Sequence, residues 1–166
     1  MEHEVEMCEL LRRSPHRNLA VYYGYVVEGD RVQGLFFKRY QSTLLETVNP
    51  KRLSKRDFLE TERDLVQHQM QRWIQQLRSA VSHIHALGYV HDDISPANIM
   101  LNENATPVLI DFGSLCRVGE SLQTVRRTVG WHDESVSLAE ERNDLDALND
   151  IETWLFRRFH DLKFPG

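Results

Sequence analysis

The clearest pattern of apolar and polar positions lies in the middle of the chain. Between residues 61 and 88, apolar side chains recur every three or four residues and glutamines fill many of the intervening positions. The apolar set consists of Val66, Met70, Trp73, Ile74, Leu77, Val81 and Ile84. This spacing predicts a long amphipathic helix with a wide apolar face. Thr61 with Asp64 resembles a capping box at its start, and Gly88 is a typical residue just past a helix end.

Shorter patterns precede this helix. A helix is predicted over Glu2–Arg13, where acids come before the two arginines as the helix dipole prefers. β-Branched and aromatic residues predict strands at Ala20–Val27 and Val32–Tyr40. The turn Glu28-Gly29-Asp30 joins these strands into a hairpin. A short helix over Thr43–Val48 follows.

The second half of the chain mixes short strands with one more helix. Two strands, Ile99–Asn102 and Val108–Asp111, flank a polar turn, and residues 114–136 are polar and loop-like. The last helix is predicted over Ala139–Arg158, and its apolar stripe consists of Leu145, Leu148, Ile151, Trp154 and Leu155. The order of elements predicts an α+β fold, with an antiparallel part first and a mainly helical part after it.

Composition narrows the class of protein. The chain has 166 residues, 41% hydrophobic and 27% charged, which suits one soluble globular domain. Its net charge of −5 argues against a nucleic-acid partner. No apolar run approaches the roughly 20 residues that span a bilayer, and the polar start is unlike a secretory signal. Cys8 and Cys116 are expected to be reduced thiols, so we expect an intracellular location, cytoplasmic by default with the nucleus as the alternative.

Three polar residues in the second half fit phosphoryl-transfer chemistry. Residues 89–100 read Tyr-Val-His-Asp-Asp-Ile-Ser-Pro-Ala-Asn-Ile-Met, and Asp111-Phe112-Gly113 follows one tight hairpin later. Taken singly, each motif also fits an ordinary turn, because Asp, Asn and Ser favour turns. Phosphoryl transfer needs an acid that positions a hydroxyl and oxygen ligands for Mg²⁺. Together the spacings predict that Asp93, Asn98 and Asp111 form one site.

These motifs resemble those of the protein kinase family over residues 4–156. His91, Asp93 and Asn98 match the catalytic loop His-x-Asp-x-x-x-x-Asn without a gap, and Asp-Phe-Gly follows in order. The loop composition is similar to that of divergent kinase-like proteins common in fungi. Residues 14–19 resemble the turn after the regulatory helix. Residues 34–40 resemble the strand that enters the hinge, with Phe37 near the gatekeeper position.

The resemblance implies ATP and Mg²⁺ as cofactors and a protein hydroxyl as the substrate. Asp93 would be the general base, and Asn98 and Asp111 would bind Mg²⁺ and, through it, the nucleotide. The backbone around Lys38 to Tyr40 would hydrogen-bond adenine. The partners expected are therefore a nucleotide and a protein substrate, without nucleic acid or membrane.

Other residues receive structural roles from the same resemblance. His91 would pack the catalytic loop against Phe112 and Gly113. Asp144, at the start of the last helix, would brace that loop from beneath. Glu6 is our choice for the glutamate of the regulatory helix, with Glu4 and Glu9 as alternatives.

The chain also departs from the family pattern. No Gly-x-Gly-x-x-Gly loop and no lysine strand precede Glu6, so residues 1–40 are interpreted as a remnant of an N-lobe and residues 41–166 as a C-lobe. Such a chain is either a fragment of a longer kinase or a reduced kinase-like protein. Asp92 stands where many kinases have an arginine, and Ser95 where many have a lysine. Activation by loop phosphorylation is therefore not expected, and Arg126 or Arg127 is expected to pair with Asp92.

Three functions fit these observations. The first is an ATP-dependent protein kinase, Ser/Thr-directed if active, with weak ATP binding and poor turnover because a phosphate-binding lysine is missing. The second is a pseudokinase that acts as a binding or scaffold module. The third is a small-molecule kinase of the same fold, of the aminoglycoside or choline type. Phe112-Gly113 and Asp144 favour the protein kinases.

Overall fold

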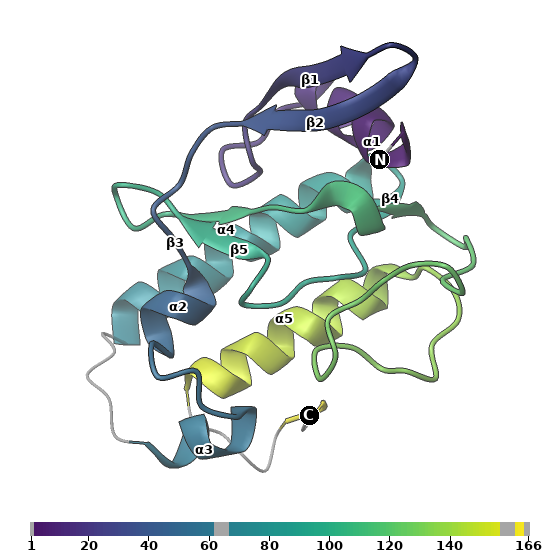
Figure 1. Ribbon diagram of the computed structural model, residues 1–166. Helices are drawn as coiled ribbons and strands as arrows, with labels where there is room; N and C mark the ends of the chain where they lie inside the picture. Colours follow the sequence, from purple (N-terminus) through teal and green to yellow (C-terminus); the bar gives the residue numbers. More distant parts are fainter. Residues whose placement is uncertain (1, 62–66, 157–161, 165–166) are drawn as a thin grey trace.

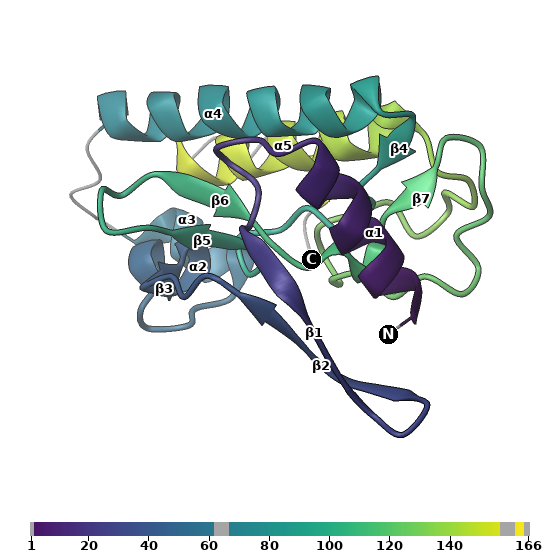
Figure 2. The same ribbon diagram turned by 90° about the horizontal axis from the view of Figure 1, so that it is seen from above.

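Two long helices, α4 (Gln67–Ala86) and α5 (Glu141–Leu155), lie side by side along one face of the molecule (Figure 1, Figure 2). The structure is a computed structural model and describes residues 2–61, 67–156 and 162–164. The predicted apolar stripe of α4 is buried from Met70 to Ile84, which confirms the amphipathic helix. Val66 and Asp64 lie outside the described residues. Gly88 follows α4 with φ +83°, a conformation that glycine adopts without steric cost.

Small antiparallel sheets cover the inner side of these helices. β3 (Ser42–Thr43), β5 (Ile99–Leu101) and β6 (Pro107–Leu109) form one sheet in that order, and β4 (Tyr89–Val90) pairs with β7 (Cys116–Arg117). The predicted hairpin around the polar turn is confirmed as β5–β6. The three two-residue strands were not predicted, because two residues are too few to show a period.

The hairpin of β1 (Tyr22–Glu28) and β2 (Arg31–Phe37) projects from the body of the molecule (Figure 2). Its existence confirms the prediction, but β2 ends at Phe37 rather than Tyr40. The amide of Lys38 donates to the carbonyl of Val21 (2.8 Å), after which the chain crosses toward β5. With only two strands, both faces stay partly open, and Tyr23, Val27 and Phe36 are exposed.

Helix α1 (Glu2–Arg13) has the predicted bounds and packs on the 3₁₀ turn η1 (Phe112–Ser114). Its inner face buries Met7, Cys8 and Leu11. The turn after α1 ties the hairpin to the sheet below. The buried side-chain amide of Asn18 donates to the carbonyl of Pro107 (2.7 Å), and Leu19 bridges Leu109.

Several predicted boundaries were wrong. Thr43 is not inside α2 (Leu44–Val48) but is its N-cap, in a capping box with Glu46. The pattern did not indicate the helix α3 (Lys55–Glu60), of which Thr61 is the C-cap. The predicted capping box of Thr61 with Asp64 extends beyond the residues that the structure describes. At α5, Ala139 precedes the helix and the predicted end at Arg158 lies outside the described residues.

Leu145 is another correction, because the predicted apolar stripe of α5 includes it. It is 38% exposed, whereas Leu148, Ile151, Trp154 and Leu155 are buried. The buried apolar residues of α5 therefore begin at Ala147. The α+β class is confirmed, and the arrangement is consistent with a partial kinase fold.

Two sequence expectations about the environment can be compared with the structure. Cys8 and Cys116 are both buried free thiols. Among the described residues, no helix is long and apolar enough to cross a membrane.

Lys55 ties four parts of the helical half together. Its ammonium group donates to the fully buried carboxylate of Asp150 on α5 and to the carbonyls of Gly130 (2.7 Å) and Phe164. It also lies 3.9 Å from the centroid of the Trp131 ring. Burial lowers the pKa of Lys55, which Asp150 opposes. A buried charge of this kind is stable only with its partner present.

We predict that Lys55→Met lowers the free energy of unfolding by about 3–5 kcal/mol, because it leaves the Asp150 carboxylate buried without its cation. Urea denaturation followed by circular dichroism measures the change. The exposed Lys51 provides the matched control, since Lys51→Met should change stability by less than about 0.5 kcal/mol. A loss below about 1 kcal/mol for Lys55→Met would contradict the role of this cluster.

Candidate active site

The segment between β4 and β5, residues 91–98, is held from below by Asp144 of α5. The Asp144 side chain is fully buried, and its two oxygens accept the backbone amides of His91 and Asp92, each at 2.9 Å. The ring of His85 on α4 adds a third contact at 2.8 Å. Asp92 has φ +60°, an uncommon conformation for a residue other than glycine. The buried carboxylate thus fixes the direction in which the next residue points.

That next residue is Asp93, whose carboxylate is held on both oxygens. The side-chain amide of Asn98 donates to one oxygen (2.8 Å) and to the Asp93 carbonyl (3.0 Å). The backbone amide of Thr128 donates to the other oxygen (2.6 Å). Because each carboxylate oxygen accepts more than one hydrogen bond, Asp93 can still accept a substrate hydroxyl. The structure therefore brings Asp93 and Asn98 into direct contact.

Asp111 reaches the same region from the end of β6. It has φ +62° and does not continue the strand, which corrects the predicted strand end. The fully buried Phe112 packs edge-on to the ring of His91, with 6.1 Å between centroids. His91 also donates through its ring to the carbonyl of Ile110 (3.1 Å). These contacts place Phe112 inward and leave the Asp111 carboxylate exposed.

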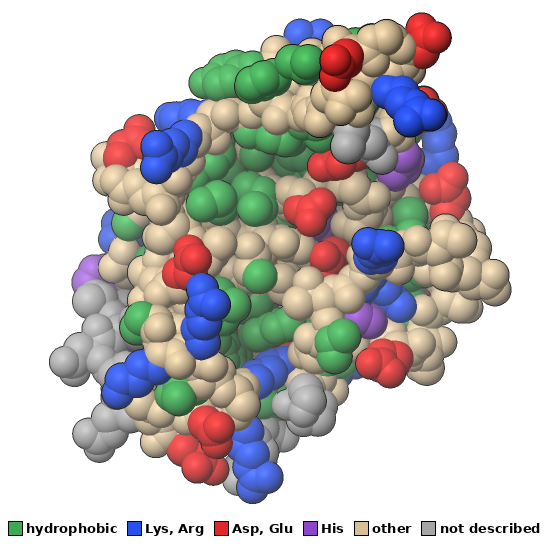
Figure 3. Space-filling view, in the orientation of Figure 1, with side chains coloured by type: hydrophobic (Ala, Val, Ile, Leu, Met, Phe, Trp, Pro, Cys, Tyr) green, Lys and Arg blue, Asp and Glu red, His purple; other side chains and the backbone are tan. Residues whose placement is uncertain are grey.

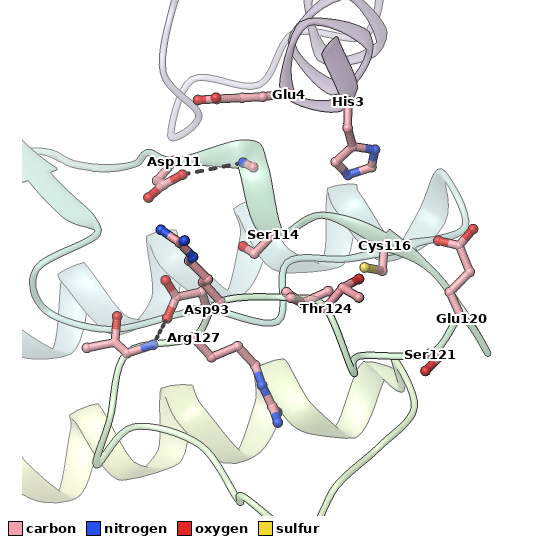
Figure 4. Close-up of a pocket in the computed structure, with 14 residues that line it drawn as sticks. His3, Glu4, Asp93, Asp111, Ser114, Cys116, Glu120, Ser121, Thr124 and Arg127 are labelled. Atoms are coloured by element: carbon pink, nitrogen blue, oxygen red, sulfur yellow. Dashed lines mark hydrogen bonds between the residues drawn. The ribbon is translucent and has the colours of Figure 1, made fainter. Parts of the chain in front are cut away.

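Asp93 and Asp111 line one cavity of about 1070 Å³ (Figure 4). The cavity is open to the face shown in Figure 3, where acidic side chains lie beside a hydrophobic hollow under the β1–β2 hairpin. Its other charged lining residues include His3, Arg126 and Arg127. Two carboxylates on different elements therefore line one polar cavity.

Glu4, rather than Glu6, is the α1 glutamate at this cavity. Glu4 lies above Asp111 (Figure 4), and its pKa is raised by burial and by the nearby Asp111 charge. Glu6 is exposed on another side of the helix. The physical reason is helical periodicity, because Glu4 shares a face with the buried Cys8 and Leu11 and Glu6 does not. Of the glutamates considered, Glu4 lies at this cavity, so the structure favours this alternative over Glu6.

A second, more apolar cavity of about 630 Å³ shares Glu4 and Asp111 with the first. The other lining residues are Ala20, Phe37, Lys38, Arg39, Tyr40, Met100 and Ile110. The Lys38 amide is already used by Val21, so it cannot donate to a ligand. The Tyr40 hydroxyl accepts the amide of Val21 (3.0 Å), which anchors the segment that borders this cavity.

The side-chain oxygens of Asn98 and Asp111 are of the kind that binds Mg²⁺. Asn98 uses its amide nitrogen toward Asp93, which leaves its oxygen as an acceptor, and the described contacts of Asp111 are limited to a weak one from the Gly113 amide (3.4 Å). Carboxylate and amide oxygens are the ligands that Mg²⁺ prefers. In the described part of the chain no group of three or more His, Cys, Asp or Glu residues could bind a metal.

Asp92 has a partner other than the expected arginine, and Ser95 lies buried beside the same loop. The Asp92 carboxylate accepts the side-chain amide of Asn143 (2.8 Å). Arg127 lowers the pKa of Asp92 through its charge, but the ion pairs of the described residues do not include one between them. Ser95 is fully buried and donates to the Thr128 hydroxyl (3.4 Å). The expected Arg126 or Arg127 pairing is thus replaced by Asn143.

Sequence reasoning missed three residues of this region. Thr128 binds Asp93 through its backbone, which leaves no trace in the side-chain pattern. His85 belongs to no motif in the sequence, and its bond to Asp144 depends on how α4 packs on α5. Asn143 directly precedes Asp144 in the sequence, and this position beside a predicted site residue was the signal that could have indicated its contact with the loop.

We predict that Asp144→Asn lowers the free energy of unfolding by about 3 kcal/mol, since an amide would turn a donor toward groups that already donate. Chemical denaturation measures the loss. Glu141→Gln on the same helix is the control, because Glu141 is exposed and lies 3.9 Å from His85. It should cost less than about 0.5 kcal/mol. Equal effects of the two variants would argue against the role of Asp144.

Asp92 predicts a specific pH dependence of stability. Burial, the largest cause, raises its pKa from 3.8 to about 7, and Asp144 adds to the rise. The folded protein thus keeps a proton in a pH range where the unfolded chain has lost it, so stability falls as pH rises from about 4 to 7. Asp92→Asn should remove this fall. Thermal unfolding of both proteins at pH 5 and pH 8 measures the change. From pH 5 to pH 8, the free energy of unfolding of the variant should rise relative to that of the parent by at least about 1 kcal/mol.

Comparison with known proteins agrees with this geometry. Residues 1–141 match the family described as Protein kinase domain. Serine/threonine-protein kinase pakG of Dictyostelium discoideum is 30% identical over 115 residues, which are 69% of this chain and 9% of that protein. MAP kinase kinase kinase SSK2 of Saccharomyces cerevisiae is 24% identical over 162 residues, which are 91% of this chain and 9% of that protein. This chain spans less than a tenth of the length of these relatives. It belongs to the protein kinase domain family.

Proposed function

We propose that the chain binds Mg-ATP and transfers its γ-phosphate to a serine or threonine hydroxyl of a protein. The observation that supports this most is the position of Asp93 and Asp111 on one cavity, with Asn98 bonded to Asp93. Residues 1–40 would act as a remnant of an N-lobe and residues 41–166 as a C-lobe. In this arrangement the nucleotide lies between the β1–β2 hairpin and the β5–β6 hairpin.

Asp93 receives the substrate hydroxyl. Its carboxylate is fixed by Asn98 and by the Thr128 amide, so it enters the reaction without a conformational search. The hydroxyl donates to an Asp93 oxygen. The carboxylate would take the proton as the hydroxyl oxygen attacks the γ-phosphorus, while the bond from that phosphorus to the bridging oxygen breaks and ADP leaves. Thr128 belongs to the loop that closes the cavity, so this loop and Asp93 are positioned together.

The nucleotide uses both cavities. Adenine fits the apolar cavity between Ala20, Phe37 and Met100, where its edge can meet the backbone from Lys38 to Tyr40. The Lys38 amide is occupied, so the backbone of Lys38 can contact adenine through its carbonyl, as a hydrogen-bond acceptor. Asn98 and Asp111 would hold Mg²⁺, which neutralises phosphate charge when bound.

Few cations face the phosphates in this chain. Among the described residues, those that line the larger cavity are Arg126 and Arg127, and Arg127 donates to the carbonyl of Val136 (3.2 Å). The site of Ser95 supplies a hydroxyl and no positive charge. Loss of one charge that stabilises the transition state costs about 10²–10³ in rate, so turnover is expected to be slow and ATP binding weak.

A binding module of the pseudokinase type is the second candidate. The β1–β2 hairpin favours it, because exposed Tyr23, Val27 and Phe36 offer apolar surface and β2 offers unpaired backbone groups at its outer edge. The intact set of Asp93, Asn98 and Asp111 favours the enzyme. Small-molecule phosphorylation is a weaker candidate, since the family match is to the protein kinase domain.

Two variants separate binding from turnover. We predict that Asp111→Asn weakens Mg-ATP binding at least about tenfold, because it removes a charged metal ligand. Asp93→Asn should leave the affinity within about threefold and reduce phosphate transfer by about 10²–10⁴. Calorimetry with Mg-ATP measures affinity, and transfer of labelled γ-phosphate to a mixed Ser/Thr peptide library measures turnover.

Asp30→Asn, in the exposed hairpin turn, is the control for charge removal and should change neither quantity. Mg-ATP binding without transfer in the parent chain would favour the binding module. Absence of Mg-ATP binding by a folded parent chain would overturn the proposed function. A low-micromolar dissociation constant with ready transfer would instead contradict the expected weakness.

A further inference from the structure

A third cavity, of about 170 Å³, lies beneath the catalytic-type loop and shares Arg127 with the larger cavity above. It is enclosed by residues 92–94, by the segment 127–136 and by the start of α5. Its inner end is formed by the buried Asp92, Ile94 and Asp144. Exposed Glu140 and Arg142 line its outer end. The cavity therefore connects solvent to a buried acid.

That acid has an unused oxygen. Asp92 is only 4% exposed, and one of its carboxylate oxygens accepts the Asn143 amide (2.8 Å). The other oxygen is buried and has no hydrogen-bond partner among the residues that the structure describes. A buried acceptor without a partner costs about 1–3 kcal/mol, more when charged. The position thus favours a ligand that brings a donor.

The surrounding charges do not satisfy this oxygen. Asp144 repels a charge on Asp92, whereas Arg127 and His85 stabilise it from a distance. Cys116, on β7, is a thiol whose raised pKa, about 11, reflects burial first and Asp92 second. The other lining cations, Arg142 and Lys163, both pair with Asp146. Asp92 therefore keeps a pKa near 7, and the ion pairs of the described residues include none between Asp92 and a cation.

We propose that this cavity binds the protonated amino group of an aliphatic primary amine, with the free oxygen of Asp92 as its counter-ion. The single oxygen without a partner suits a compact ammonium group better than a guanidinium, which prefers two parallel acceptors. An anion is excluded by the two buried carboxylates at the inner end, Asp92 and Asp144. Both oxygens of Asp144 are used by amides, so a metal ion would find one free ligand atom there.

The walls of the cavity fit the carbon chain of such a ligand. Ile94, Trp131 and Val136 line it between the buried acid and the surface. About 10–15 Å³ suffices for one water molecule, so the cavity has room for an alkyl chain as well as for the charged group. The same ammonium chemistry could come from a free amine or from a lysine side chain of a docked protein.

Binding of the amine is coupled to ionisation of Asp92. At pH 6 the acid is mostly protonated and has no charge to offer, and at pH 8 it is mostly ionised. Saturation-transfer NMR of the full chain with n-butylammonium should therefore give an affinity about tenfold higher at pH 8 than at pH 6. Carbon-13 NMR of the Asp92 carboxyl should show its pKa falling as the amine is added. Neutral 1-butanol, similar in shape, should not bind comparably.

Asp92→Asn should abolish the charge-dependent binding, whereas Asp30→Asn in the hairpin turn should retain it. Circular dichroism shows whether Asp92→Asn folds, and the parent-chain pH titration tests the proposal even if it does not. Nα-acetyl-lysine methylamide keeps the side-chain ammonium group of lysine. If it binds more tightly than butylammonium, the ligand is a lysine side chain, and the reverse order would identify a free amine. If neither probe binds the parent chain at pH 8, the cavity contains only water and the proposal is overturned. Butylammonium binding that persists unchanged in folded Asp92→Asn would overturn it as well.

Discussion

A fully buried carboxylate, Asp144, is the constraint on which the candidate site depends. A charge in that position is tolerated only if hydrogen-bond donors surround it, and the donors are the amides of His91 and Asp92 and the ring of His85. The loop must therefore present two successive amides downward. That requirement gives Asp92 its positive φ and directs Asp93 to the opposite side, into the cavity.

The same loop meets the second acid through apolar packing. Phe112 is fully buried against His91, and its burial turns the chain so that Asp111 remains exposed beside it. Hydrophobic burial of one side chain thus positions the charge of its neighbour. Catalysis of phosphoryl transfer depends mainly on such positioning and on electrostatic stabilisation. The described residues of this chain provide the positioning more completely than the electrostatic stabilisation.

Much of this arrangement could be predicted from the sequence, because local rules decide it. The periodic apolar residues from Met70 to Ile84 predict α4, and the hairpin β5–β6 follows from two short apolar segments around a turn. The order of Asp93, Asn98 and Asp111 predicted a common site, since a hairpin of that length returns the chain to its start. The boundaries were less accurate: capping by Thr43 and the separate helix α3 depend on single hydrogen bonds that no period records.

Tertiary structure decided which residues of similar type face the site. Glu4 and Glu6 are equivalent in composition and differ only in the helix face that packs on η1, so the contact of α1 selects Glu4. Thr128 reaches Asp93, and Asn143 reaches Asp92, across long separations in the chain. The sequence by itself determined the helices, the hairpins and the set of polar residues available for chemistry. Only packing decided their partners, because burial and hydrogen bonding between distant segments have no local signature.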